Sequence, residues 1–333
     1  MQASLSVVRR RPRDRSRLEG LAGRLAVTIR SCSAKLGDPL DSYLHVGTEA
    51  LRLSVDRSLL AQAARARTRR ELEALVGKIK GTISLEHRQF SATRLGPVVP
   101  GSSVKGNVRS RLELSFVPRE GRVRSCLIRA TYPEEEPEWR HYRIWRASLQ
   151  QYRGQPCSCT EGWEVCEVCL LCDLFGTTGL QGLVSFSDFV GEGVSLQRLS
   201  LPIGESLEAA PPGSRFKGSV TFRNLEPVEL GLLLYGMGLR NSRVGRPVLL
   251  GKLKYRRDLP HVFGVVRYEL EELALAPFSQ PLNIGRAEVK PGAGVSGDQL
   301  DLTVLELVSL ASSEFSGELL DVDEVAEVER LKA

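Results

Sequence analysis

The stretch PGSSVKGNVRSRLE, which runs from Pro100 to Glu113, combines a turn, the start of a helix and several basic side chains. Its first two residues, proline and glycine, favour a turn. Ser102 or Ser103 is then suited to cap a helix, because a serine hydroxyl accepts a hydrogen bond from an amide near the helix start. The sequence therefore predicts a short helix over 104–114.

The predicted helix is basic. Arg109 follows Lys105 by one helical turn, so the two cations share a face, and Arg111 adds a third positive charge. The N–H groups and hydroxyls at a helix N-terminus form a ready site for phosphate. Two interpretations stay open at this point: a phosphate-binding turn, or an ordinary capped helix with exposed basic side chains.

The composition sets limits on the class of protein. The 333-residue chain has 42% hydrophobic and 26% charged residues, as a soluble globular protein does. It has no run of eighteen apolar residues, so no membrane-spanning helix is expected. The N-terminus is rich in arginine but has no apolar core, which argues against a secretory signal. We therefore expect a cytoplasmic protein without a framework of disulfide bonds.

Positive charge is concentrated in three places, and the net charge is +6. Clusters of this kind suit a polyanion such as nucleic acid. Solvated surface charge is the alternative explanation for each of them. The clusters are the arginines of the first seventeen residues, the group Arg65, Arg67, Arg69 and Arg70, and the group Lys252, Lys254, Arg256 and Arg257.

Five of the seven cysteines fall between Cys157 and Cys172, with the spacing C-x-C-x6-C-x2-C-x2-C. Thiolates at such short spacings can converge on one ion, and structural zinc takes four ligands in a closed tetrahedron. Buried thiols and an iron–sulfur cluster are the alternatives. We expect structural zinc, and the predicted ligands are Cys166, Cys169, Cys172 and Cys159, with Cys157 as the alternate for Cys159.

The rest of the chain mixes strands and helices. The pattern predicts strands at 24–31, about 82–94, about 123–131 and 219–222, and helices at 59–80, 228–237 and 321–331. These elements do not follow the regular βαβ alternation of a doubly wound sheet, which favours the α+β class.

Three segments together resemble a known family. Pro100–Glu113 is similar to the P-G-S-S-x-K-G-x-x-R signature of the RAMP superfamily of CRISPR-associated proteins. Cys169–Gly176, followed by Gly182–Phe189, resembles a segment of the backbone subunits of type III CRISPR effector complexes. Leu249–Val266 resembles, more loosely, the family's glycine-rich loop. The three segments also occur in the family's order.

The resemblance implies an RNA-recognition-motif-like (ferredoxin-like) fold, with an antiparallel sheet as its core and inserted lobes, to which the cysteine spacing adds a zinc-binding segment. Residues 1–20 would form a basic, disordered tail, and 21–333 a single RAMP-type RNA-binding domain. Insertions are expected at about 57–97 and 132–175, the second of which contains the zinc-binding segment 157–172.

The resemblance also implies partners. They are a guide RNA, a target RNA, other effector subunits and neighbouring copies of the chain, with no membrane. The residues expected to bind RNA are Ser102, Ser103, Lys105, Arg109, Lys252, Lys254, Arg256 and Arg257.

In family members that cleave target RNA, an acidic residue ahead of the Gly-Ser-Ser turn acts with a divalent metal ion. Asp56 falls on that position, and Asp41 and Asp38 are the runners-up. RNA supplies its own nucleophile, the 2′-hydroxyl, and magnesium needs only one or two protein carboxylates. His45 is a possible general base, or it packs within its loop.

Two functions from different classes therefore stay open. One is a metal-dependent endoribonuclease subunit within a guide-RNA complex, and the other is a structural or capping RNA-binding subunit of the same kind of complex. A self-contained guide-processing endoribonuclease is a third hypothesis. The helical stretch between Asp56 and Pro100 departs from the family pattern and has to be an insertion.

Overall fold

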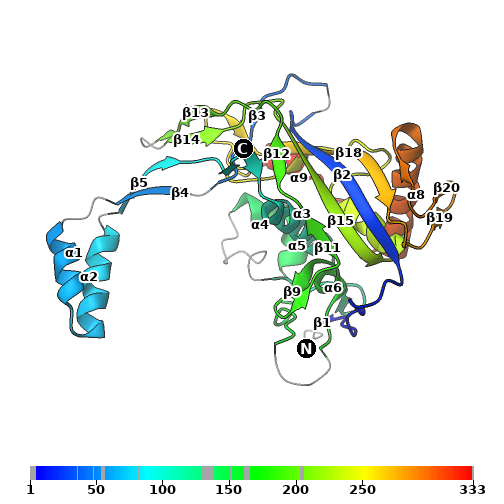
Figure 1. Cartoon of the computed structure of the whole chain (residues 1–333), viewed down its shortest axis with the longest axis horizontal. Coiled ribbons are helices and arrows are strands. Elements are labelled where there is room, and N and C mark those ends of the chain that lie inside the picture. Colours follow the sequence, from blue (N-terminus) through cyan, green and yellow to red (C-terminus); the bar gives the residue numbers. More distant parts are fainter. Residues whose placement is uncertain are drawn as a thin grey trace.

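The computed structural model describes residues 5–35, 37–47, 49–53, 57–81, 83–128, 139–150, 152–160, 166–202 and 206–331. Its centre is an antiparallel sheet with three long, curved strands (Figure 1). The middle strand, β2 (Leu21–Ser31), pairs with β15 (Arg215–Leu225) on one side and with β18 (Val265–Leu275) on the other. The predicted combination of helices with an antiparallel sheet is confirmed.

The register of these strands aligns large apolar side chains into a continuous core. Ile29 of β2 lies opposite Phe216 of β15 and Tyr268 of β18, and all three are fully buried. Such cross-strand rows are the unit that stabilises a sheet. The sheet continues on both sides in the order β16-β18-β2-β15-β12-β7-β6, and β11 and β21 pair with β15 and β18. The shorter strands are β6 (Ala92–Thr93), β7 (Gly96–Val99), β11 (Val184–Phe186), β12 (Phe189–Gly191), β16 (Val248–Leu249) and β21 (Gly294–Val295).

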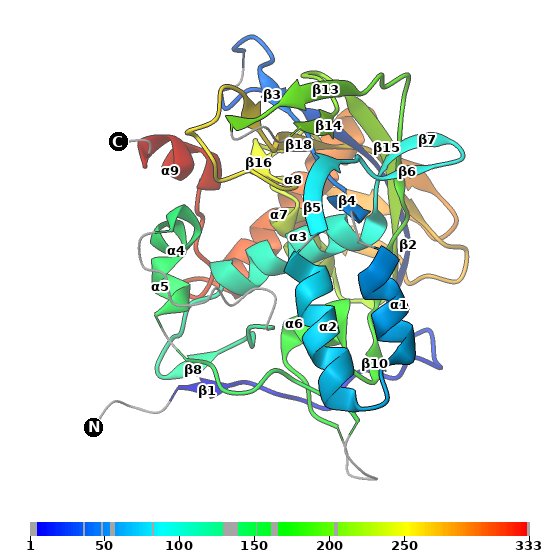
Figure 2. The same cartoon turned by 90° about the vertical axis from the view of Figure 1, so that its left-hand side faces the viewer.

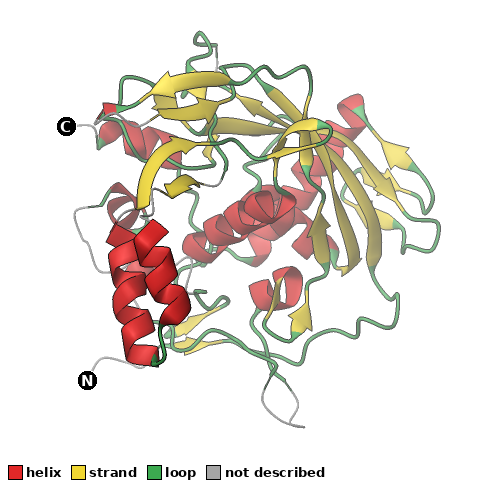
Figure 3. Cartoon of the chain, turned by 60° about the vertical axis from the view of Figure 1, so that its left-hand side comes forward, coloured by secondary structure: helices red, strands yellow, loops and turns green. Residues whose placement is uncertain are grey.

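Three helices pack beside the long strands (Figure 3): α3 (Gly101–Ser115), α7 (Pro227–Gly236) and α8 (Gly297–Glu314). The α7 sequence is apolar on all sides, as expected for a helix enclosed by protein. Glycines let these helices approach closely. A Cβ at Gly231 would lie 2.0 Å from the Leu307 carbonyl oxygen of α8, and one at Gly236 would lie 2.7 Å from the Leu112 side chain of α3.

A long arm extends from this body (Figure 1). It consists of the antiparallel pair β4 (Glu49–Leu53) and β5 (Ile83–Arg88), with the helical hairpin α1 (Arg57–Arg65) and α2 (Arg69–Gly81) at its end. The two helices lie side by side (Figure 2). The arm occupies much of the stretch in which an insertion was expected. β4 and β5 join a second sheet through β14 (Ser206–Ala209), which pairs in turn with β13 (Gln197–Ser200).

The single helix predicted over 59–80 is wrong, because the chain turns at residues 66–68 and forms two helices. A capping box starts the second one. The Thr68 hydroxyl accepts a hydrogen bond from the Glu71 amide (3.2 Å), and the Glu71 carboxylate accepts one from the Thr68 amide (3.3 Å). The T-x-x-E pattern in the sequence is the usual signal of such a helix start.

The N-terminal segment, predicted to be a disordered tail, follows a defined path across the body from residue 5 onward. β1 (Ser6–Val7) pairs with β8 (Arg122–Val123). Further on, Arg13 forms an ion pair with Glu229, and Arg15 forms one with Asp173 (2.6 Å). Both carboxylates are almost completely buried. The arginines hold the segment down because a buried carboxylate requires a compensating charge.

The remaining elements are short. The part of the chain between β8 and the cysteine segment contains α4 (Arg140–Ile144) and α5 (Arg146–Leu149), and Trp145 anchors both helices in a small apolar cluster with Leu114. The others are β3 (Ser42–Tyr43), β17 (Val262–Phe263), α6 (Leu170–Phe175), β9 (Gly176–Thr177), β10 (Leu180–Gln181), β19 (Leu282–Ile284), β20 (Ala287–Val289) and α9 (Glu324–Arg330). Among the described residues, no helix has the length and apolar character needed to cross a membrane.

Candidate functional site

Four cysteine sulfurs meet in the interior, and we call Cys126, Cys157, Cys169 and Cys172 the cysteine cluster. All four residues are buried, and their sulfurs lie within 4.8 Å of one another. The Cys126 sulfur is 3.5 Å from that of Cys172 and 3.6 Å from that of Cys169. Zinc–sulfur bonds of about 2.3 Å in a tetrahedron put sulfurs about 3.8 Å apart. The cluster therefore has the donor atoms, spacing and closure to bind a metal ion such as zinc.

Local structure positions these sulfurs. Cys169 is the N-cap of α6, and its sulfur accepts a hydrogen bond from the Cys172 amide (3.4 Å). The Cys157 sulfur accepts one from the Cys169 amide (3.3 Å). Hydrogen bonding between the thiols raises the pKa of Cys126 and lowers that of Cys157. A cation is what would let all four sulfurs ionise together.

The cluster contains the predicted Cys169 and Cys172, and it contains Cys157, the alternate, in place of Cys159. Cys126 takes the place predicted for Cys166. Cys159 and Cys166 do not join it but are bonded to each other as a disulfide, with Cα atoms 5.3 Å apart. Cys126 takes part although it stands far from the other cysteines in the sequence, where no spacing marks it. The fold brings it in from the segment that follows β8.

The inner flank of α3 faces this cluster. Arg109, predicted to contact RNA, is buried instead. Its guanidinium bonds the Glu113 carboxylate (2.7 Å), the Gly176 carbonyl oxygen (2.6 Å) and the Cys172 sulfur (3.2 Å). Every donor nitrogen of this guanidinium has a partner in the protein. Arg109 therefore neutralises the buried Glu113 carboxylate and places a positive charge beside the Cys172 sulfur.

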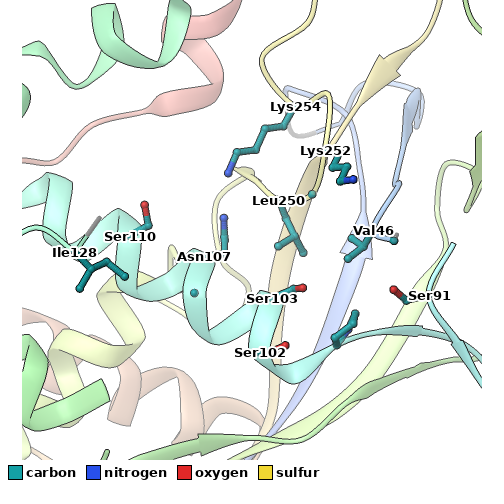
Figure 4. A pocket seen from close by; sticks show the side chains of 14 residues that line it. Val46, Ser91, Ser102, Ser103, Asn107, Ser110, Ile128, Leu250, Lys252 and Lys254 are labelled. Atoms are coloured by element: carbon teal, nitrogen blue, oxygen red, sulfur yellow. The ribbon is translucent and has the colours of Figure 1, made fainter. Parts of the chain in front are cut away.

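The outer flank of α3 lines a pocket of about 500 Å³, which we call the α3 pocket (Figure 4). Its walls come from α3, from the segment after β3 and from the loop after β16, so it brings together parts of the chain that are far apart in sequence. Four of the eight residues predicted to bind RNA line it: Ser102, Ser103, Lys252 and Lys254. Lining residues that the sequence did not single out include Val46, Ser91, Gly106, Asn107, Ser110, Ile128 and Leu250.

The serines at the start of α3 do not cap it, contrary to the prediction. The helix begins at Gly101, whose amide donates to the Asp188 carboxylate (2.9 Å). The Ser103 amide donates to the Pro100 carbonyl oxygen (2.9 Å). Within the described residues, the hydroxyls of Ser102 and Ser103 have no hydrogen-bond partner. They are available to a ligand, whereas the Asp188 carboxylate already occupies the tip of the helix.

Lys254 contributes a positive charge to the pocket. Its ammonium group extends over α3 toward Asn107 (Figure 4) and lies 5.3 Å from the centre of the Tyr255 ring. It makes no ion pair with any carboxylate in the described part of the chain. Burial lowers the pKa of Lys254, because the charged form loses solvation. An anion bound in the pocket would stabilise the charged ammonium group and so offset this loss of solvation.

The other cations predicted to bind RNA lie elsewhere. Arg256 pairs with Asp258 (2.5 Å), and the buried Arg257 pairs with Glu329 (2.7 Å). Lys105 is partly buried one turn before Arg109 and does not line the pocket. These three side chains form contacts within the protein or lie outside the pocket. Among the described residues that line the pocket, the cations are Lys252 and Lys254.

The acidic candidates are not part of the pocket as described. Asp56 lies outside the described residues. Asp38 and Asp41 are exposed in the loop after β2, and neither lines the pocket. His45 is buried, with Nδ1 2.6 Å from the Glu208 carbonyl oxygen, and burial lowers its pKa. His45 therefore packs in the interior, as the second interpretation expected, but its partners are Glu208 of β14 and Phe90 rather than residues of its own loop.

Comparison with known families gives one result that covers most of the chain. The model of the RAMP superfamily matches residues 40–290. The matched region contains both the α3 pocket and the whole cysteine cluster. A comparison with individual curated proteins gave no match.

Proposed function

Because the chain belongs to the RAMP superfamily, we propose that it is the guide-RNA-binding backbone subunit of a type III CRISPR interference complex. The observation that carries this function is the α3 pocket. Its walls combine lysines with serine hydroxyls that have no partner among the described residues, the groups that bind a phosphodiester backbone. Base pairing of the guide would supply sequence specificity, so the protein needs no base-reading contacts there.

Two further features support a RAMP-type architecture. The curved antiparallel sheet, with α3, α7 and α8 beside it, fits an RNA-recognition-motif-like core to which the arm is added. The arm extends away from the body (Figure 1), as a lobe that reaches a neighbouring subunit would. Both would be required in an assembly that repeats along a guide.

We further propose that the cysteine cluster holds one structural zinc ion. Its four thiolates would complete a tetrahedron, which leaves no open position for a substrate. The role of the ion is then to tie α6 to the segment after β8. Arg109 would stabilise the thiolate of Cys172 through its hydrogen bond.

Target-RNA cleavage is the second part of the proposal, and it rests on the family resemblance. Asp56 is its candidate residue, and Leu53, the last described residue before it, ends β4 on the arm. Asp56→Ala in the assembled complex should abolish metal-dependent cutting of target RNA and leave binding intact. Cutting by the unaltered complex should leave a 2′,3′-cyclic phosphate, and DNA of the same sequence should survive.

A non-catalytic structural or capping subunit is the alternative. The observation that favours it is the lack of any carboxylate among the described residues that line the α3 pocket. If the unaltered complex cuts no RNA with any divalent ion, the alternative replaces the cleavage proposal. Full cutting by the Asp56 variant would instead direct attention to Asp41 and then Asp38.

RNA binding itself is tested by charge removal. Fluorescence anisotropy with a labelled single-stranded RNA should show that Lys254→Ala weakens binding to all sequences alike and lowers the salt slope by about one. Lys290→Ala is the matched control, because Lys290 is an exposed lysine just after β20 that pairs with Glu288 and does not line the pocket. Equal affinities and salt slopes for the two variants would remove the α3 pocket from the RNA path.

A further inference from the structure

One face of α3 forms the floor of the α3 pocket and carries no large side chain. Ser103, Gly106, Asn107 and Ser110 are spaced three, four and seven residues apart, so they share one face of the helix. All four line the pocket. From Ser103 to Ser110 this face is about 10 Å long. It offers small side chains at both ends and, between them, helix backbone that no large side chain covers.

Gly106 is the most informative of these residues. Glycine in the middle of a helix is unfavourable because of its backbone entropy. The fold does not require it here, since a Cβ at Gly106 would meet no atom within 4 Å. Gly231 and Gly236 are different, because a Cβ there would collide with a neighbouring helix. Because Gly106 lines the α3 pocket, the open space above it allows a ligand in the pocket to approach the helix backbone closely.

The polar groups around this floor divide into fixed and available ones. Asn107 is fixed: its amide nitrogen donates to the Leu249 carbonyl oxygen (2.8 Å), and its oxygen accepts from Arg111 (2.9 Å). The Ser110 hydroxyl has no partner in the described part of the chain. It lies in the pocket near the apolar Ile128, on the side over which Lys254 extends (Figure 4).

We propose that one ribose of a bound strand lies against Gly106 and donates its 2′-hydroxyl hydrogen to the Ser110 hydroxyl oxygen, so that the pocket prefers RNA to DNA. The neighbouring phosphates would then contact Lys254 on one side and the serines at the start of α3 on the other. A hydroxyl both accepts and donates, which makes it a suitable partner for another hydroxyl. The 2′-hydroxyl is the group by which a protein distinguishes RNA from DNA. This inference rests on the RNA-binding function proposed above.

The test compares three labelled oligomers of equal length and base: oligouridylate, its 2′-deoxy form and its 2′-fluoro form. The fluoro sugar keeps an RNA-like pucker but cannot donate a hydrogen bond. The unaltered chain should bind the ribo-oligomer more tightly than the other two. Ser110→Ala should reduce that preference about threefold to tenfold, the range expected for one neutral hydrogen bond, and should leave affinity for the deoxy-oligomer unchanged.

Gly106→Ala tests whether a ribose lies against the helix backbone at Gly106, the position that we call the ribose seat. The added methyl group should weaken ribo-oligomer binding at least as much as Ser110→Ala does, while the protein stays folded, because alanine favours the helix. Gly77→Ala is the matched control, since Gly77 also lies in a helix with open space at its Cβ position, and it should leave binding unchanged.

Other outcomes distinguish a failure of the ribose contact from a failure of the proposed RNA-binding function. Binding of none of the three oligomers would overturn both. Equal binding of the ribo- and deoxy-oligomers would overturn the ribose seat but leave RNA binding in place. If the fluoro-oligomer bound as tightly as the ribo-oligomer, or if Ser110→Ala kept the full preference, the hydrogen bond to Ser110 would be wrong.

Discussion

Helix α3 has two flanks that differ in how their polar atoms are satisfied. On the inner flank, Arg109 and Glu113 bond to each other, and the guanidinium also bonds a carbonyl and a cysteine sulfur. On the outer flank, the hydroxyls of Ser103 and Ser110 have no partner among the described residues. Buried polar groups are normally paired within the protein. Charge alone therefore does not identify a binding surface: Arg109 is fully paired within the protein, whereas the outer-flank hydroxyls remain available to a ligand.

The largest expected effect is on stability, when a ligand of the cysteine cluster beside the inner flank is replaced. Cys126→Ser should remove the metal and with it much of the folding free energy, because structural zinc sites contribute about 10–16 kcal/mol of apparent binding free energy. Metal analysis of the unaltered protein should find about one equivalent of zinc. Thermal unfolding should begin at a much lower temperature in the variant.

Two controls sharpen this result. Cys32→Ser alters a buried cysteine that lies outside the cluster, and Cys159→Ser breaks the disulfide, so both variants should retain the metal. If instead Cys159→Ser lost the metal and Cys126→Ser kept it, the ligand set predicted from the sequence would replace the clustered one.

The next effect, by size, is on the inner flank itself. Arg109→Met should destabilise the protein by about 3–5 kcal/mol, because it leaves the buried Glu113 carboxylate without its partner. Adding Glu113→Gln should recover part of the loss. Denaturant unfolding measures both variants, and Arg286→Met, at an exposed arginine, serves as the control.

The RNA affinity of the same variant tests whether the two flanks differ in role. The folded Arg109→Met protein should bind single-stranded RNA as the unaltered protein does. Unchanged stability together with weaker RNA binding would make Arg109 an RNA contact, and the two flanks would no longer differ in role.

The smallest expected effect is on the outer flank. The double variant Ser102→Ala, Ser103→Ala should change the free energy of unfolding by less than about 0.5 kcal/mol, whereas removal of a true helix cap would cost about 1 kcal/mol. Its affinity for RNA should fall about threefold to tenfold for each hydroxyl that hydrogen-bonds the RNA in the unaltered protein. A large drop in stability with unchanged affinity would return the serines to the capping role.

Much of the fold and part of the site could be predicted from the sequence, and the failures have physical reasons. The turn and helix at Pro100–Glu113 are local features, and the helix forms there. The short spacing between Cys169 and Cys172 is local too, and their sulfurs do converge. Cys126 could not be predicted, because only the packing of the segment after β8 brings it to the cluster.

Two features of the sequence indicate local contacts beyond those predicted. Arg109 and Glu113 are four residues apart on the predicted helix, which is the spacing of an intrahelical ion pair. Thr68 and Glu71 have the spacing of a capping box, which marks the break between α1 and α2. By contrast, the partners of the N-terminal arginines lie far away along the chain, so no local pattern could show that this segment is held down.

Photo-crosslinking would show whether RNA lies along the outer flank of α3. Single-stranded RNA that carries 4-thiouridine would be crosslinked to the purified chain, and mass spectrometry would identify the attached peptides. If RNA lies there, crosslinks are expected in the peptides that contain Ser102–Ser110 and Leu250–Lys254. Crosslinks confined to other parts of the molecule, such as the α1–α2 hairpin, would contradict it.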